Sequence, residues 1–273
     1  MSIHTYHTSH RSPRTFYALK RGASVPTLKT VADPGARAFV GVELEIEAGR
    51  ADRHALSDEV DAIMGNLATC ETDGSLNDGF EIITQPATVP AFLKAFKLDE
   101  LTDLLTAKGA KSASTSTCGL HVHYSRAALG ASEQARDMVC AKLLVLMDKF
   151  TDQLVKFARR DWTNLHYAKK WDNFNASGEN STKKLLGKYK PCKDSGDRYH
   201  ALNLTNSATI EFRIFKGTLN PVTLRATVEL VEAMVEYCKT HTTPEVQAAT
   251  WADVIGMSAY PELAEFCTAR GIA

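Results

Sequence analysis

Four short stretches of the chain alternate between apolar and polar residues, as strands with one face on a core do. Each stretch places acidic, imidazole or guanidinium side chains at a spacing of two. The stretches are residues 41–47, 79–83, 119–124 and 209–215. Because alternate side chains of a strand point to the same face, the polar groups of each stretch gather on one side of a sheet.

This alternation has two interpretations. A strand with one solvated face shows the same pattern without any binding site. However, glutamate is depleted in strands, and like charges side by side on one face repel each other. Glu43, Glu45 and Glu47 share one face, so they predict a cation that offsets their charge. We expect Glu47, at the strand end, to lie in solvent rather than bind metal.

Helical periodicity and capping residues separate the strands. We predict strands over 38–47 and 198–205, and helices over 57–67, 90–105, 132–160 and 222–239. Runs of strands with long helices between them are typical of an α+β fold. We therefore expect a largely antiparallel, curved sheet with helices packed on one face.

The chain shows no internal repeat and no linker that divides it. Residues 1–37 are rich in Ser, Thr, Arg and Pro and predict a polar, poorly ordered N-terminal arm. Residues 38–273 then form a single catalytic domain. Within it, residues 156–198 contain eleven Lys and Arg against five Asp and Glu, which predicts a basic mobile segment. Such a segment is either a lid or a solvated loop.

Composition excludes several classes of protein. The formal net charge is zero, so the overall charge of the chain does not favour a nucleic-acid or membrane partner, although a nucleic-acid substrate stays possible. No apolar run approaches the length of a membrane span. Six scattered cysteines without a CxxC pair are typical of free thiols in a reducing compartment. We therefore predict a cytoplasmic enzyme of unknown oligomeric state.

The first three polar strands favour a magnesium site. Glu43 and Glu45 lie about 6.6–6.8 Å apart at Cα on one strand face, close enough to hold one Mg²⁺ or bridge two. Mg²⁺ prefers oxygen ligands and is commonly bound by one or two carboxylates plus substrate phosphates. Glu81 supplies another carboxylate, and either His121 or His123 supplies an imidazole.

The fourth strand favours phosphate chemistry beside the metals. Glu211 completes a second metal site, and Arg213 would neutralise phosphate oxygens through forked hydrogen bonds. Two metals with an arginine suit phosphoryl transfer from a nucleotide. The sequence has neither GxxxxGK[ST] nor GxGxxG, so the nucleotide would be held by the sheet rather than by a glycine-rich loop.

Five segments add a family signal: GVELEIE, TDGSLNDGFEIITQP, CGLHVHYS, RYHALNL and TIEFRIFKGT. In this order, over residues 39–240, they resemble the amidoligase family. That family belongs to the glutamine synthetase and glutamate–cysteine ligase superfamily of carboxylate–amine ligases. The resemblance implies a fold like the glutamine synthetase catalytic domain, with ATP and two Mg²⁺ ions as cofactors.

The resemblance also implies roles for individual residues. The metal ligands would be Glu43, Glu45, Glu81, His123 and Glu211. The ATP contacts would be His121, His123, Arg213 and Arg198. The catalytic residues would be Glu43, Glu211, Arg213 and Arg198, with Arg198 touching phosphate or substrate.

These observations favour an ATP- and Mg²⁺-dependent ligase that forms an amide or isopeptide bond through an acyl phosphate. Its substrates would be a small-molecule or peptide carboxylate and an amine, whose identities stay open. Two alternatives remain: a His-x-His metal-dependent hydrolase, and a non-catalytic nucleotide-binding protein of the same fold. ATP-dependent as opposed to zinc-dependent turnover separates the ligase from the hydrolase.

Overall fold

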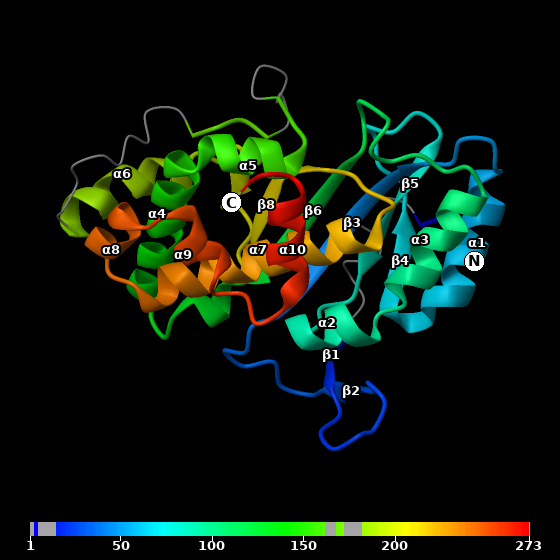
Figure 1. The fold of residues 1–273 in the computed structure, drawn as a ribbon, viewed down its shortest axis with the longest axis horizontal. Coiled ribbons are helices and arrows are strands. Elements are labelled where there is room, and N and C mark those ends of the chain that lie inside the picture. The colour runs from blue at the N-terminus through cyan, green and yellow to red at the C-terminus, as the bar shows by residue number, and fades with distance from the viewer. Residues whose placement is uncertain (1–2, 5–14, 162–167, 172–181, 273) are drawn as a thin grey trace. The chain divides into compact units, whose positions relative to one another are not determined.

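The computed structural model describes residues 3–4, 15–161, 168–171 and 182–272, which fall into two compact units. The first unit comprises Met1–Pro34, Phe39–Val122 and Lys216–Leu224. The second comprises Gly35–Ala38, His123–Phe215 and Arg225–Ala273. Each unit combines helices with antiparallel strands (Figure 1), so the predicted α+β class is confirmed.

The sheet of the first unit carries most of the predicted acidic residues. Its strands are hydrogen-bonded in the order β4 (Ala68–Glu71), β5 (Gly79–Thr84), β3 (Val40–Glu47) and β6 (Gly119–Ser125). The pairs β4/β5 and β5/β3 are antiparallel. Strand β3 confirms the strand predicted over 38–47. Val42, Leu44 and Ile46 are at most 2% exposed, so one face of β3 lies in the core and the glutamates take the other.

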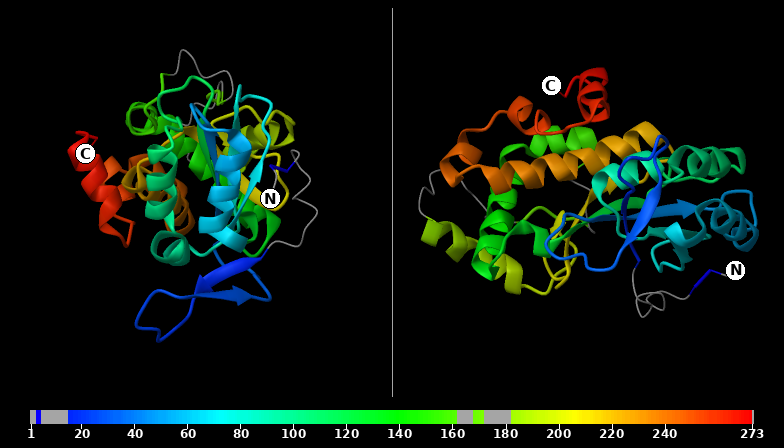
Figure 2. Two further views of the ribbon diagram at one scale, coloured as in Figure 1. Left: turned by 90° about the vertical axis from the view of Figure 1, so that its right-hand side faces the viewer. Right: turned by 90° about the horizontal axis from the view of Figure 1, so that it is seen from below.

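Helices and a hairpin complete the first unit. They are α1 (Arg53–Met64), the short 3₁₀ helix η2 (Gly65–Leu67), α2 (Val89–Ala95), α3 (Leu98–Ala107), β1 (Phe16–Leu19) and β2 (Leu28–Val31). Helix α1 packs beside α3 and β4. Strands β1 and β2 pair antiparallel and extend from this unit next to α2 (Figure 2). The N-terminal arm predicted over residues 1–37 therefore contains a β-hairpin.

The predicted start of the first helix at Ser57 is wrong. The helix begins one turn earlier because Oδ1 of Asp52 accepts hydrogen bonds from the backbone N–H groups of His54 and Ala55, at 3.0 and 2.9 Å. Asp52 is therefore the N-cap. Ser57 is fully buried inside the helix, where its hydroxyl donates to the carbonyl of His54.

The second unit is mainly helical. Its strands β7 (Leu202–Asn203) and β8 (Thr209–Lys216) pair antiparallel. Its helices are η3 (Arg126–Leu129), α4 (Glu133–Lys149), α5 (Thr151–Ala158), α6 (Thr182–Asp194), α7 (Pro221–Thr240), α8 (Thr243–Ala248), α9 (Trp251–Ile255) and α10 (Pro261–Ala269). Helix α4 contacts α6 and α8. Among the described residues, no helix is long and apolar enough to cross a membrane.

Two predicted features of this unit differ from the structure. The helix predicted over 132–160 is interrupted at Phe150, whose backbone leaves the helical region (φ −100°, ψ 31°), so that α4 and α5 are separate. The basic segment 156–198 contains helix α6, which the sequence did not predict. Residues 162–167 and 172–181 of this segment lie outside the described residues.

Candidate functional site

A row of buried carboxylates crosses three strands of the first unit. In the strand register, Glu81 of β5 stands directly opposite Glu45 of β3 on one side and Glu71 of β4 on the other. Residues directly opposite each other point to the same face. The exposed fractions of Glu45, Glu81 and Glu71 are 6%, 3% and 0%. The sheet therefore collects three acidic groups in a place that water barely reaches.

A fourth carboxylate joins this row from a loop. Carboxylate oxygens of Glu45, Asp73 and Glu81 lie within 4.8 Å of one another. Asp73 begins a turn between β4 and β5, in which the backbone N–H of Ser75 donates to Asp73 Oδ1 at 2.7 Å. We call Glu45, Asp73 and Glu81 the carboxylate cluster. The structure thus brings together two of the predicted metal ligands and adds Asp73.

The carboxylate cluster is electrostatically unfavourable without a cation. Burial and, after it, the charges of neighbouring acids together raise the pKa of the Glu81 carboxyl to about 10. Those neighbours are Glu43, Asp73, Glu45 and Glu71. A divalent cation would offset the repulsion that a proton otherwise relieves. Since every donor in the cluster is a carboxylate oxygen, the residues fit a hard ion such as Mg²⁺.

His121 lies between the two glutamates of β3. Its Nδ1 is 3.1 Å from Oε2 of Glu43, and its Nε2 is 3.8 Å from Oε1 of Glu45. The Glu45 carboxylate also accepts a hydrogen bond from the backbone N–H of Gly119. These contacts fix the orientation of both carboxylates, as partners of metal ligands commonly do. The structure gives His121 an orienting position, and its predicted contact with ATP stays a prediction.

In the second unit, Glu211 has donors at both carboxylate oxygens. The side-chain amide of Asn203 donates to Oε2 at 2.7 Å. The guanidinium of Arg213, two residues along β8, donates to Oε1. Side chains of Glu211 and Arg213 are 4% and 12% exposed. The side-chain amide of Asn206 also donates to Oε2, at 3.4 Å, so two amides and one guanidinium hold the Glu211 carboxylate. A metal ion bound to Glu211 would compete with Arg213 for this carboxylate.

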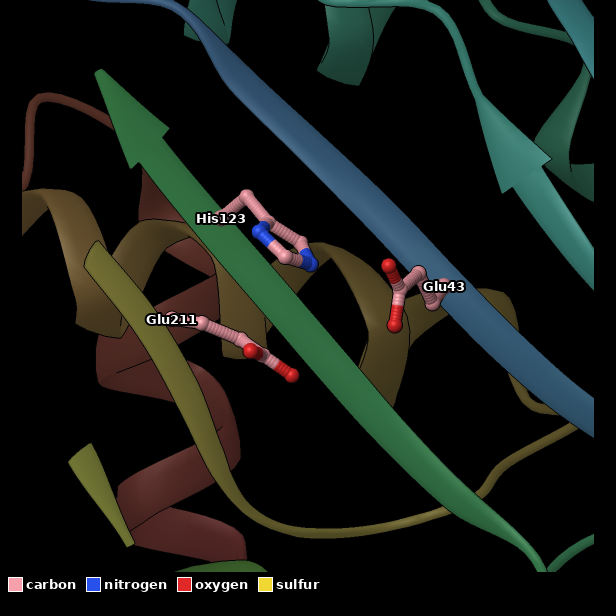
Figure 3. A group of neighbouring side chains, drawn as sticks. All are labelled: Glu43, His123 and Glu211. Atoms are coloured by element: carbon pink, nitrogen blue, oxygen red, sulfur yellow. The ribbon is translucent and has the colours of Figure 1, made fainter. Parts of the chain in front are cut away.

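His123 lies near Glu211 on the adjacent strand. Its Nδ1 is 3.2 Å from the hydroxyl of Thr209, and ligand atoms of His123 and Glu211 lie within 4.8 Å of each other. Figure 3 shows these two side chains on strands β6 and β8, and it also labels Glu43 of the first unit. An imidazole and a carboxylate at this separation can share one metal ion, so the pair is consistent with the predicted ligands.

Arg198 lies on the surface, whereas the cysteines are buried. Arg198 is exposed, and its guanidinium carbon lies 5.3 Å from the ring centroid of Tyr199. All six cysteines are buried and form no disulfides. Burial raises the pKa of Cys118 above its ordinary value, which keeps the thiol protonated and poorly nucleophilic. Cys118 therefore gives no support to covalent catalysis by a thiol.

Glu71 and Asp73 were not among the site residues predicted from the sequence. Glu71 follows Cys70 at the end of a four-residue strand, too short to show an alternating pattern. Its place becomes visible only from the pairing of β4 with β5. Asp73 belongs to an Asp-Gly turn, where aspartate is common for local reasons alone.

Comparison of the sequence with models of protein families finds a match over much of the chain. The sequence model of a family described as "Putative amidoligase enzyme" matches residues 54–235. The matched span includes Asp73, Glu81, His123 and Glu211, whereas Glu43 precedes it. No curated protein sequence matches the chain.

Several solved structures are similar to the chain. One of them is a bifunctional glutathione synthetase from Pasteurella multocida, with 11% sequence identity and a TM-score of 0.43. The match covers 86% of this chain but only 46% of that one.

Proposed function

The chain belongs to the amidoligase family, and we propose that it is an ATP- and Mg²⁺-dependent ligase that joins a carboxylate to an amine. The bond formed would be an amide or an isopeptide bond. The observation that carries this proposal is the row of buried carboxylates on β3, β5 and β4, with Asp73 beside it. Such a row favours a hard divalent cation, and Mg²⁺ commonly acts together with substrate phosphates.

Two groups of residues would hold two ions. Glu45, Asp73 and Glu81 would hold the first, because their oxygens already lie within 4.8 Å of one another. His123 and Glu211 would hold the second, with Glu43 as the further ligand predicted from the sequence. His121, which contacts Glu43 within the first unit, would orient that carboxylate. When bound, the ions would neutralise the charge of the transferring phosphoryl group.

The arginines would bind the phosphate groups. Arg213 now donates to Glu211; when the Glu211 carboxylate binds metal, the guanidinium becomes available for phosphate oxygens. Arg198, which is exposed, would bind phosphate or substrate from the solvent side. A guanidinium presents a planar fork of donors that matches phosphate geometry. The positive charges would thus meet the charge that develops during phosphoryl transfer.

The reaction would proceed in two steps. A carboxylate oxygen of the substrate attacks the γ-phosphorus of ATP, the bond to the β–γ bridging oxygen breaks, and ADP leaves. The amine nitrogen then attacks the acyl carbon, the bond from that carbon to the phosphate oxygen breaks, and the nitrogen loses a proton. The residues that carry this scheme are Glu43, Glu211, Arg213 and Arg198. No protein nucleophile is required, which agrees with the buried and protonated Cys118.

The proposal also covers the fold of the chain and its location in the cell. The antiparallel sheet with one acidic face supports a fold like the catalytic domain of glutamine synthetase. We propose a cytoplasmic enzyme that acts on small-molecule or peptide substrates.

Binding of Mg·ATP tests the proposal without knowledge of the substrates. We expect Glu43→Gln and Glu211→Gln to remain folded and to lose Mg²⁺-dependent ATP binding in calorimetry, since each removes a metal ligand. Glu59→Gln is a matched control: Glu59 pairs with Lys108 on the surface, with 41% of its side chain exposed. Wild-type Mg·ATP affinity in both site variants would overturn the assignment.

A trapping assay tests the chemistry. Hydroxylamine intercepts acyl phosphates, so ATP, Mg²⁺, hydroxylamine and pools of amino acids or peptides should yield a hydroxamate together with ADP. Mass spectrometry would identify the carboxylate. Hydrolysis of amides that depends on zinc and ignores ATP would instead support the His-x-His hydrolase. ATP binding without any turnover over a broad substrate set would support the non-catalytic alternative.

A further inference from the structure

Glu47 is the third glutamate on the acidic face of β3, and it has a different environment from Glu43 and Glu45. Its Oε1 accepts hydrogen bonds from the backbone N–H of Asn77 at 3.0 Å and from the hydroxyl of Thr117 at 2.9 Å. Its Oε2 accepts from the backbone N–H of Asp78 at 2.8 Å. Glu47 lies at the end of β3, as predicted from the sequence, but its carboxylate accepts from donors of two separate loops, which the sequence did not predict.

The first of these loops, residues 72–78, carries Asp73 to the carboxylate cluster. At its far end, Glu47 holds Asn77 and Asp78, and the carbonyl of Asp78 accepts from the N–H of Ala48 at 2.9 Å. The loop then enters β5 at Gly79, which stands opposite Glu47 in the register. A Cβ on Gly79 would lie 1.9 Å from the carbonyl oxygen of Ile46, so the backbone approaches β3 as closely as glycine allows.

The second loop, residues 111–118, leads into β6. Lys111 and Glu47 exchange backbone hydrogen bonds of 2.8 and 2.9 Å, and Thr117 donates to the Glu47 carboxylate. Two residues after Thr117, the N–H of Gly119 donates to the Glu45 carboxylate. The same side chain thus anchors the loop that delivers Asp73 and the loop that orients Glu45.

We propose that Glu47 is a positioning residue, which holds Asp73 and Glu45 in the geometry that binds the first metal ion and is not itself a ligand. Both of its oxygens already receive N–H or O–H donors, so the carboxylate has its charge compensated without a cation. This inference rests on the proposed function, because it presumes that the carboxylate cluster binds a divalent ion. Removal of a partner that orients metal ligands commonly lowers metal affinity by about 10- to 100-fold.

Titration with Mn²⁺, a paramagnetic substitute for Mg²⁺, separates a positioning residue from a ligand. We expect Glu47→Ala to bind the wild-type number of Mn²⁺ ions with an affinity about 10- to 100-fold lower. Glu47→Gln, which keeps one acceptor oxygen, should show a smaller loss. Glu81→Gln removes a ligand and should lower the number of bound ions by one. Glu59→Gln should behave as the wild type does.

Hydrogen exchange in the metal-free protein gives a second readout. The amides of Asn77 and Asp78 should exchange faster in Glu47→Ala, because their acceptor is gone, while the amides of β5 keep their protection. Circular dichroism checks that Glu47→Ala and Glu47→Gln fold. Wild-type Mn²⁺ affinity in these two variants would overturn the inference about Glu47 but not the proposed function. A lower number of bound ions in Glu47→Ala would do the same. A wild-type protein that binds no Mn²⁺ would overturn the proposed function itself.

Discussion

Replacing Glu81 by glutamine should stabilise the metal-free protein, which is the opposite of what removing a buried polar contact usually does. The folded state raises the pKa of Glu81 from 4.5 to about 10 through burial and neighbouring carboxylates. The folded protein therefore keeps a proton that the unfolded chain releases above pH 4.5. By linkage, the free energy of unfolding falls as pH rises from the unfolded pKa toward the folded one. Glutamine is neutral at every pH and has no such dependence.

The size of the effect follows from the pKa difference. One pH unit corresponds to about 1.4 kcal/mol, so the interval from 4.5 to pH 7 costs the wild type about 3 kcal/mol. Glu81 is 3% exposed, so solvent screening removes little of this cost. We expect Glu81→Gln to be more stable than the wild type by about 3 kcal/mol at pH 7 in the presence of EDTA. The difference should widen by about 2 kcal/mol by pH 8.5 and shrink by a similar amount at pH 5.5.

Urea unfolding followed by circular dichroism, at pH 5.5, 7 and 8.5, measures these differences. A second series with Mg²⁺ should reverse the order, because the ion stabilises the ionised cluster of the wild type and the variant lacks one of its ligands. Glu59→Gln should follow the wild type in both series. Equal stability of Glu81→Gln and wild type at all three pH values in EDTA would refute the electrostatic reasoning about the cluster.

Two further predictions concern the second unit. Asn203→Ala removes the nearer of the two amides that donate to Glu211 Oε2 and should lower the free energy of unfolding by about 1–3 kcal/mol, as measured in urea; an unchanged value would show that the Asn203 amide contributes nothing. Reversing the charges of the exposed Lys183 and Lys184 on α6 should raise the KM of an anionic substrate and leave kcat near the wild-type value. An unchanged KM would favour a solvated surface without a role in binding. Protection of residues 156–198 from proteolysis by Mg·ATP would indicate a lid.

The strands were predictable because their signal is local. An alternation with period two over 41–47 or 209–215 fixes which side chains share a face, whatever the rest of the chain does. Strands β3 and β8 accordingly lie where expected. The row that Glu71 joins depends instead on the register of β4 against β5, which pairs it with Glu81. Register is set by contacts between distant residues, and a four-residue strand carries too short a pattern to reveal it.

Two predicted helix boundaries were wrong. Asp52 and Ser57 are both good N-caps, and only the structure shows that Asp52 makes the capping hydrogen bonds. The 132–160 stretch is helical on both sides of Phe150, so its periodicity gave no reason for a break.

For Glu47, the alternating pattern correctly predicted which face of the strand carries the side chain. It could not show that Asn77, Asp78 and Thr117 donate hydrogen bonds to the Glu47 carboxylate.

The fate of the carboxylate oxygen tests the ligase mechanism most directly. With a carboxylate substrate identified by trapping and labelled with ¹⁸O, turnover with ATP, Mg²⁺ and the amine should give ADP and phosphate in step with amide formation. One ¹⁸O atom per turnover should appear in the phosphate, because the acyl phosphate carries that oxygen when it breaks down. Release of AMP and pyrophosphate, or amide formation without ATP, would contradict an acyl-phosphate ligase.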